Sequence, residues 1–238
     1  MQNRPYISVL VTAYNEEKDL PLCLDSIKNS DYPQEKYEII VVDNNSTDKT
    51  ASIALKYGAL VIKETKQGNT FAVSTGMKAA KGEIIAMTDA DSIVNKSWLL
   101  EIDKLFQDKK IVAATGTADI LTRSKIFNIT SEFFYELFLR FNSFLGKPHL
   151  TGFNLVVRKS ALEKVGGINE AFTMSPDVDL GLRIKREGKV VFSSKLKVIT
   201  SFRRWEENAW KTFTTYLNGY IYTVWLRKPP PVKQNVVR

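Results

Sequence analysis

The 238-residue sequence contains one cysteine, Cys23, and one histidine, His149. A single cysteine cannot form an internal disulfide, so the sequence favours a reducing compartment over a secreted protein. Cys23 lies in the helix-type segment LPLCLDSI, and we expect it to be a small buried residue. His149 has no cysteine or histidine neighbours that would complete a metal site, so we interpret it as a loop or substrate-contacting residue.

Long apolar runs and glycine-rich phosphate loops are also missing. No run reaches the ~18 apolar residues that a membrane-spanning helix needs, and residues 1–4 lead into a strand rather than a signal peptide. These absences predict a cytoplasmic protein. Neither a Walker loop nor a GxGxxG fingerprint occurs, and the segment VTAYNEEKD, at the end of the first predicted strand, contains no glycine.

Acidic side chains are scarce toward the C-terminus. Residues 183–238 hold 13 basic and 3 acidic side chains, whereas residues 1–182 hold 21 basic and 23 acidic ones, and the net charge is +8. The excess predicts an anion-attracting surface that could meet phosphates, acidic lipid or nucleic acid. Because no reading helix or aromatic platform accompanies it, we expect no nucleic-acid partner.

Short apolar segments alternate with helix-type segments in the N-terminal half. Predicted strands cover 6–14, 37–43, 59–64 and 82–89, and predicted helices cover 16–29, 47–57, 70–80 and 96–107. This order predicts an α/β fold with a mostly parallel central sheet and helices on both faces. Ligands of such sheets bind beyond the carboxyl ends of the strands, so the polar residues that follow each strand should share one rim.

The second half of the sequence alternates less regularly. We predict strands at 110–121, 189–192 and 196–202, a strand leading into a helix over 152–167, and helices over 125–145, 177–187 and 206–226. Residues 1–226 should form a single domain, and the proline-containing basic residues 227–238 should form an exposed tail. Aromatic residues at helical spacing in 130–146 and 213–228 indicate mainly core burial, with shallow contact to an anionic membrane as the alternative for the second segment.

Asp89 directly follows the apolar run IIAMT, and one residue separates it from Asp91. Two adjacent carboxylates repel each other unless a positive charge joins them. Oxygen ligands without a cysteine or histidine cluster suit Mn²⁺ or Mg²⁺. The alternative is that one aspartate caps the next helix and the other is solvated, and the spacing alone does not separate the two interpretations.

Four segments in order resemble the family 2 glycosyltransferases: ISVLVTAYNEEKDLPLCLDSI, YEIIVVDNNSTDKT, MTDADS and SPDVDLGLRIKREG. The resemblance covers nearly the whole chain. It implies the GT-A fold, with a Rossmann-like sheet, residues 1–110 as the nucleotide-binding half and 111–226 as the acceptor-binding half. It also implies transfer of a sugar, with inversion, from a nucleotide-diphosphate donor to the hydroxyl of a glycan or lipid-linked acceptor. UDP is the commoner donor nucleotide in this family.

Donor-binding residues follow from the resemblance and from the shared rim. Tyr14 and Glu16 would hold the base and ribose, Asp43 would accept a hydrogen bond from the base, and Thr12 lies at the same strand end. Lys66 would reach a donor phosphate. Each assignment has an alternative. Tyr14 could be a packed aromatic residue and Glu16 a charge at a helix start. Asp43 could be a cap for NNST, and Lys66 could be a solvated lysine.

The resemblance identifies MTDADS as a metal-binding DxD motif. Asp89 would face the ribose and metal, and Asp91 would bind the metal and bridge it to the diphosphate. Arg203 and Arg204 stand where related sequences contact the diphosphate, although two arginines on an exposed basic face are the alternative. Processive members carry Gln-x-x-Arg-Trp, and Ser201 replaces that glutamine. We therefore expect a non-processive enzyme.

Asp177 matches the catalytic base of the family, which removes the proton from the acceptor hydroxyl. Alternatively it caps the following helix, with Asp179 solvated or paired to Arg183. The family usually has an acidic residue before this aspartate, and here it is Pro176, which stiffens the backbone. A sugar nucleotidyltransferase and a catalytically silent binding module remain alternatives, but the first expects a glycine-rich loop and the second expects loss of the acids.

Overall fold

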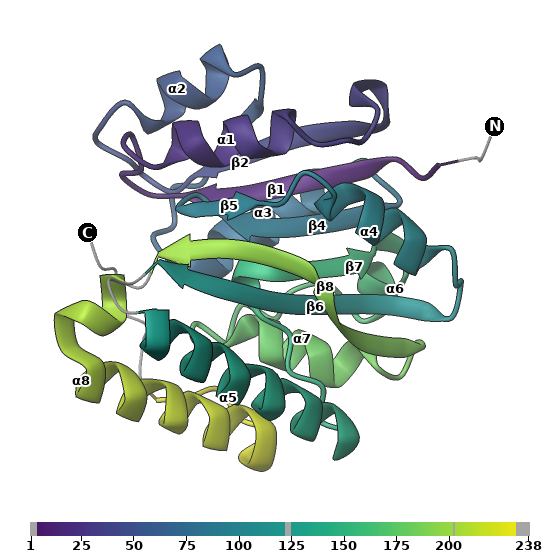
Figure 1. Ribbon diagram of the computed structural model, residues 1–238, viewed down its shortest axis with the longest axis vertical. Helices are drawn as coiled ribbons and strands as arrows, with labels where there is room; N and C mark the ends of the chain where they lie inside the picture. The colour runs from purple at the N-terminus through teal and green to yellow at the C-terminus, as the bar shows by residue number, and fades with distance from the viewer. Residues whose placement is uncertain (1–3, 122–124, 202, 232–238) are drawn as a thin grey trace.

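The computed structural model describes residues 4–121, 125–201 and 203–231; within these ranges the side chains of 120–121, 125–132, 203–207 and 209 are not described. A central sheet of eight strands runs through the molecule in the order β3-β2-β1-β4-β7-β6-β8-β5 (Figure 1). The strands are β1 (Ile7–Ala13), β2 (Tyr37–Asp43), β3 (Leu60–Lys63), β4 (Ile84–Asp89), β5 (Ser92–Val94), β6 (Ile111–Leu121), β7 (Leu155–Arg158) and β8 (Lys189–Ser201).

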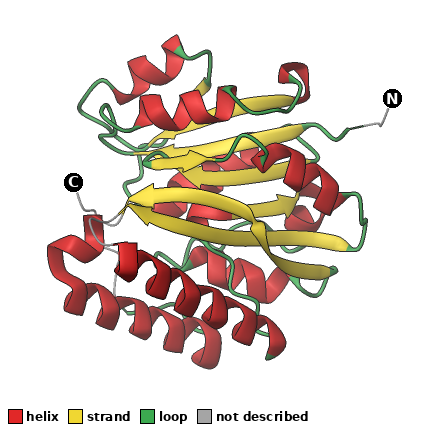
Figure 2. Cartoon of the chain, in the orientation of Figure 1, coloured by secondary structure: helices red, strands yellow, loops and turns green. Residues whose placement is uncertain are grey.

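Helices cover both faces of the sheet, as the sequence predicts (Figure 2). The helices are α1 (Leu20–Lys28), α2 (Thr50–Lys56), α3 (Asn69–Ala79), α4 (Trp98–Phe106), α5 (Lys125–Phe144), α6 (Lys159–Lys164), α7 (Pro176–Ile184) and α8 (Arg203–Tyr220). Two 3₁₀ turns, η1 (Gln34–Lys36) and η2 (Gly152–Asn154), and a π-helix, η3 (Ile221–Leu226), complete the described chain.

Side chains of β1 alternate between two apolar layers. Val9 and Val11 pack into the layer that contains α1 and α4, and Leu10 packs into the layer of α3 and α7. Both layers are buried, which is why the strand is apolar on every residue but Ser8 and Thr12. Strands β1 to β4 are parallel to one another, and the antiparallel strand β7 joins β4 to β6.

The two strands predicted at 189–192 and 196–202 form one strand, β8. Its register against β6 shifts where Gly116 pairs with Ser193 and Thr117 pairs with Lys197, so the intervening residues bulge from the ladder. Gly116 leaves room for the backbone of Leu196, whose carbonyl oxygen accepts a hydrogen bond from Asn154 Nδ2 at 2.7 Å. The polar residues of this bulge resemble a turn in the sequence, which explains the wrong division.

Two further differences concern short or irregular elements. Strand β5 was not predicted because three residues give too little alternation to recognise. The predicted last helix, 206–226, begins earlier and is interrupted, since Asn208 has non-helical dihedral angles and the π-helix η3 replaces its final turns. The other helices and strands lie within a few residues of their predicted bounds.

Candidate functional site

The carboxyl ends of β1, β2 and β4 meet at one rim of the sheet. In the strand register, Thr12 lies opposite Asp89, and Ala13 lies opposite Asp43. The structure therefore confirms that three of the polar strand ends are neighbours, although it does not test the roles assigned to them. Thr12 and Asp43 are buried, whereas Asp89 is partly exposed at the end of its strand.

The loop after β1 is tied to the loop after β2. The Ser46 hydroxyl accepts from the Asn15 N–H at 2.9 Å, and the Thr50 hydroxyl accepts from the Glu16 N–H at 2.7 Å. Asn15 has a φ of 53°, a left-handed conformation that asparagine tolerates. These bonds fix Glu16, which is 2% exposed, while the neighbouring Tyr14 remains partly exposed.

Asp43 makes the contact that the sequence offered as an alternative role. Its Oδ1 accepts a hydrogen bond from the Ser46 N–H at 3.1 Å, so it caps the turn after β2. This bond occupies one lone pair of one oxygen, and a carboxylate has several. Capping and binding are therefore compatible for Asp43.

Asp89 and Asp91 flank the tight turn from β4 to β5. Ala90 between them is buried, and both aspartates are partly exposed. The Cys23 Sγ of α1 lies 3.5 Å from the Asp89 carbonyl oxygen. Burial raises the pKa of the Cys23 thiol, and the negative charges of Asp91 and Asp89 raise it further. Two carboxylates thus lie near one buried sulfur, and the prediction that Cys23 is a buried core residue is confirmed.

This turn suits a divalent cation that brings other ligands with it. Within the described part of the chain, no group of three or more His, Cys, Asp or Glu side chains could hold a metal ion. Asp89 and Asp91 supply hard oxygen atoms and leave the remaining positions open. Mg²⁺ commonly binds through one or two carboxylates together with water and phosphate oxygens, so the donor set fits such an ion.

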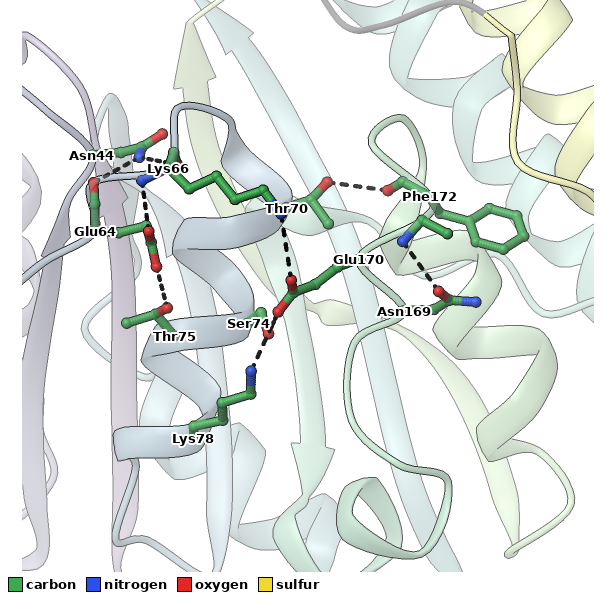
Figure 3. Close-up of polar contacts among 11 residues, drawn as sticks. Asn44, Glu64, Lys66, Thr70, Ser74, Thr75, Lys78, Asn169, Glu170 and Phe172 are labelled. Atoms are coloured by element: carbon green, nitrogen blue, oxygen red, sulfur yellow. Dashed lines mark hydrogen bonds and ion pairs between the residues drawn. The ribbon is translucent and has the colours of Figure 1, made fainter.

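Lys66 lies in a loop that Asn44 anchors to the rim (Figure 3). The Asn44 Nδ2 donates to the carbonyl oxygens of Glu64 and Lys66 at 3.0 and 2.8 Å. The Lys66 Nζ lies 3.9 Å from a Glu170 carboxylate oxygen and 3.7 Å from the centroid of the Phe71 ring. Lys66 therefore has an acidic partner on the segment that precedes α7, and it is not merely solvated.

Asp177 is the second residue of α7, and backbone groups hold both of its oxygens. Its Oδ2 accepts from the Gly152 N–H at 2.7 Å, and its Oδ1 accepts from the Val178 N–H at 3.0 Å. Burial raises the pKa of the Asp177 carboxyl to about 6, against the lowering effect of these bonds. A Cβ placed on Gly152 would also contact Met87 of β4, so Asp177 lies near the carboxyl half of that strand.

The sequence prediction missed Tyr135, which interacts with Asp177, and Tyr216, which interacts with Tyr135. Burial raises the pKa of the Tyr135 hydroxyl, with added contributions from the charges of Asp177 and Tyr216, while a hydrogen bond with Thr151 opposes them. Tyr135 comes from α5 and Tyr216 from α8, so α5 brings a tyrosine to this carboxylate and α8 brings a second one to the first. No local motif marks either tyrosine, because both sit among other aromatic residues at helical spacing.

Arg203 and Arg204 open α8, and their side chains lie outside the described residues. Their backbone position is nevertheless informative. Thr200 pairs with Ser92 in the β5–β8 ladder, and its hydroxyl lies 2.9 Å from the Ser92 hydroxyl. Since Ser92 follows Asp91 directly, the start of α8 is near the acidic turn.

His149 lies in the segment between α5 and η2, as predicted, but it packs against rings. Its centroid is 5.2 Å from that of Phe138 and 6.2 Å from that of Tyr220. Burial lowers the pKa of His149 to about 4. Its Nδ1 is buried, and no hydrogen-bond partner for it exists among the residues whose placement is described. His149 is therefore a neutral packing residue near the C-terminal helix.

Solved structures with the same architecture are glycosyltransferases of the GT-A fold. The mannosyltransferase PcManGT from Pyrobaculum calidifontis, in complex with GDP-Man and Mn²⁺, superposes with a TM-score of 0.75 at 24% identity, covering 97% of this chain and 67% of that one. TarS from S. aureus superposes with a TM-score of 0.66 at 16% identity, covering 92% of this chain and 40% of that one. These likenesses establish the fold.

The sequence itself assigns the family. The model of glycosyl transferase family 2 matches residues 8–166, and the chain belongs to that family. A beta-monoglucosyldiacylglycerol synthase of Nostoc sp. is 32% identical over 195 residues, which cover 76% of this chain and 41% of that protein. The probable glycosyltransferase YdaM of Bacillus subtilis is 27% identical, over 94% of this chain and 57% of its own length. The chain thus spans about half the length of these relatives.

Proposed function

We propose that the protein is an inverting, metal-dependent glycosyltransferase that moves one sugar per encounter from a nucleotide-diphosphate donor to an acceptor hydroxyl. The observation that carries the proposal is the position of Asp177, a carboxyl with a pKa of about 6, near the carboxyl half of the strand that ends in Asp89. A base and a candidate phosphate site thus belong to one edge of a family 2 domain.

In this proposal the donor binds along the rim, in the half formed by residues 1–110. Tyr14 and Glu16 contact the base and ribose. Asp43 accepts a hydrogen bond from the base with its remaining lone pairs, and Thr12 contacts the donor at the end of β1. The fixed loop supports these roles, because hydrogen bonds from Asn15 and Glu16 to the neighbouring loop hold it before any donor arrives.

Asp89 and Asp91 would hold Mn²⁺ or Mg²⁺ against the donor diphosphate. When bound, such an ion offsets the charge that develops on a leaving nucleoside diphosphate. Arg203 and Arg204 would add guanidinium donors to the same phosphates, since the start of α8 lies near this turn. Lys66 would exchange its Glu170 partner for a donor phosphate.

Asp177 would accept the proton of the acceptor hydroxyl as that oxygen attacks the anomeric carbon. A base works best when its pKa is close to the working pH, and burial has moved this carboxyl in that direction. The Gly152 and Val178 N–H groups hold both oxygens in place. Tyr135 would border the carboxylate within the acceptor-binding half, formed by residues 111–226, and Tyr216 interacts with Tyr135.

UDP is the donor nucleotide that we favour, and GDP is the alternative to test. The fold neighbours include PcManGT with GDP-Man and TarS with UDP, so they supply both nucleotides. The acceptor is proposed to be a glycan or a lipid-linked molecule, and the Nostoc relative is named for a glucosyldiacylglycerol product. A cytoplasmic location, with α8 as the element that would meet a membrane, is part of the same proposal.

A sugar nucleotidyltransferase and a silent binding module remain the competing proposals. No helix of the described chain is both long and apolar enough to cross a bilayer. The acids retained at positions 43, 89, 91 and 177 favour catalysis over silent binding. Formation of a new glycosidic bond, rather than a nucleotide sugar, distinguishes a transferase from a nucleotidyltransferase.

A thermal-shift panel of UDP, GDP, ADP and CDP, each with and without Mn²⁺, tests the donor site. We expect one nucleotide to stabilise the protein only when the metal is present, and Asp91→Asn to abolish that response. Asp108→Asn is a matched control, because Asp108 pairs at 3.7 Å with Lys189, at the opposite end of the strands. The proposal is wrong if no nucleotide responds, or if Asp91→Asn responds like the wild type.

A further inference from the structure

Helices α5 and α8, with η3, expose many large apolar side chains. Phe134, Phe141 and Phe144 of α5 are 65%, 57% and 87% exposed, and Trp210 of α8 and Trp225 of η3 are 74% and 59% exposed. We call this set, with Phe213, the two-helix surface. The expectation that most of these aromatic residues are core residues is wrong for the described part of both helices.

The two helices lie side by side at one edge of the molecule (Figure 1). The Tyr220 hydroxyl donates to Asn142 Oδ1 at 2.7 Å, and the Phe138 and Tyr220 rings are 5.5 Å apart. The two-helix surface stays exposed beside these contacts. An exposed apolar area of this extent marks an interaction site, because isolated exposed residues would not cluster on adjacent elements.

Basic side chains surround the two-helix surface. Lys147, Lys211, Arg227 and Lys228 are on or next to its elements, and the Lys147 Nζ lies 2.8 Å from the Trp225 ring centroid. The described side chains of α5 include one acid, Glu136, which is paired with Arg140 at 2.7 Å, and none occurs among those described in 208–231. An apolar face rimmed with basic groups and tryptophan complements a surface with negative headgroups above hydrocarbon.

From these observations we propose that the two-helix surface binds an anionic lipid bilayer. A second copy of the chain is a poorer occupant, since a two-fold pair would place the same basic rims against each other. A protein partner would need an acidic rim around an apolar groove, whereas an anionic leaflet offers both features without further specificity.

The position of the site extends this proposal to the acceptor, and this step rests on the proposed function. Tyr135 of α5 and Tyr216 of α8 interact with each other, and Tyr135 also interacts with Asp177. The Tyr135 ring lies 6.2 Å from that of Phe153, which follows Gly152, the residue whose N–H donates to Asp177. Val224 of η3 packs in one cluster with Val178, the residue after Asp177. Docking through α5 and α8 would therefore hold Asp177 near the headgroup plane. The acceptor class that fits is an amphiphile anchored in the bilayer, whose hydroxyl reaches Asp177 without leaving the membrane.

Flotation with phosphatidylglycerol-containing and pure phosphatidylcholine vesicles tests the docking step without donor or metal. We expect binding to the anionic vesicles that weakens with salt, and little binding to the neutral ones. Lys211→Gln and Lys228→Gln should each lower the affinity about fivefold. The double variant Phe141→Gln/Trp225→Gln should reduce it at least about tenfold.

Leu55→Gln is the matched control, because Leu55 is 62% exposed on α2, which packs against β2 and β3 far from α5 and α8 (Figure 1), and should leave binding unchanged. Each variant should retain the metal-dependent nucleotide response, which shows that it is folded. The proposal is overturned by absence of binding to anionic vesicles, by equal binding to both kinds, or by equal loss in Leu55→Gln. A lipid-free dimer that the Phe141→Gln/Trp225→Gln variant dissociates would assign the surface to a second copy instead.

Discussion

Replacing Asp177 by asparagine separates its role as a base from its role in the fold. The side chain keeps its size, but only one of its two terminal atoms can accept a hydrogen bond. The Gly152 and Val178 N–H groups, now at 2.7 and 3.0 Å from carboxylate oxygens, would compete for it. One unsatisfied N–H costs about 1–3 kcal/mol.

The raised pKa of Asp177 changes the effect of the substitution on the unfolding free energy in the opposite direction. A carboxyl with a pKa of about 6 in the folded state and 3.8 as its ordinary value binds its proton more tightly when folded, so the unfolding free energy falls as the pH rises between these values. At about pH 8 the full difference is about 3 kcal/mol. Asparagine removes this difference, so at about pH 8 the variant should be as stable as the wild type or more stable by up to about 2 kcal/mol. At about pH 4 it should be less stable by about 1–3 kcal/mol.

Activity should change far more than stability. We expect kcat/KM of the wild type to fall below about pH 6, as the base becomes protonated, and Asp177→Asn to lose about 10²- to 10⁴-fold. Urea unfolding at both pH values and a pH–rate profile measure the two effects. The control Asp179→Asn breaks the 2.7 Å pair with Arg183 on the same helix and should keep the acid limb. Full turnover by Asp177→Asn would refute its assignment as the base.

The remaining predictions concern three other positions. Glu170→Gln should release Lys66 from an exposed pair at 3.9 Å, lower the KM for the donor, and change the unfolding free energy by less than about 1 kcal/mol; an unchanged KM would exclude Lys66 from the phosphate site. His149→Phe should remove the histidine's contribution, which lowers stability as the pH falls from 6.5 to about 4, because the histidine is neutral when folded and must be protonated on unfolding; urea titrations should show the variant gaining stability relative to the wild type as the pH falls, and a constant difference would contradict this. Gly116→Ala should lower the unfolding free energy, measured in urea, by at least about 2 kcal/mol, because its methyl group overlaps the carbonyl of Leu196. Wild-type stability of this variant would contradict the close approach of Gly116 to Leu196.

Local sequence predicts most of the fold because the buried strands are recognisable as short apolar runs. Every residue of β1 is at most 8% exposed, so the run ISVLVTA has no solvent-facing side and its apolar pattern is nearly uninterrupted. Where an element has mixed surroundings, the prediction fails. Strand β8 is half exposed and carries a bulge that only the backbone crossing at Gly116 explains, and no pattern within residues 189–201 contains that information.

The candidate site is predictable to the same extent. Strand order and register bring Thr12, Asp43 and Asp89 to one rim. The sequence predicts this meeting because the strands are parallel and their carboxyl ends are polar. Tyr135 and Tyr216 could not be found in this way, because the interaction of Tyr135 with Asp177 and of Tyr216 with Tyr135 depends on how α5 and α8 pack. The exposure of the two-helix surface was missed for a related reason: helical spacing of apolar residues shows that a face is apolar, but not what covers it.

Pro176 shows why a departure from a family motif needs the tertiary structure for its interpretation. Proline suits the first turn of a helix, and here it begins α7 after Ser175, whose φ of 58° is left-handed. The helix start should favour an ionised Asp177 and so lower its pKa. Burial outweighs this effect, since the pKa is raised to about 6 despite two bonds from N–H groups. The stiff residue before the aspartate is thus compatible with a base, and the surrounding packing, rather than the helix start, decides how strong that base is.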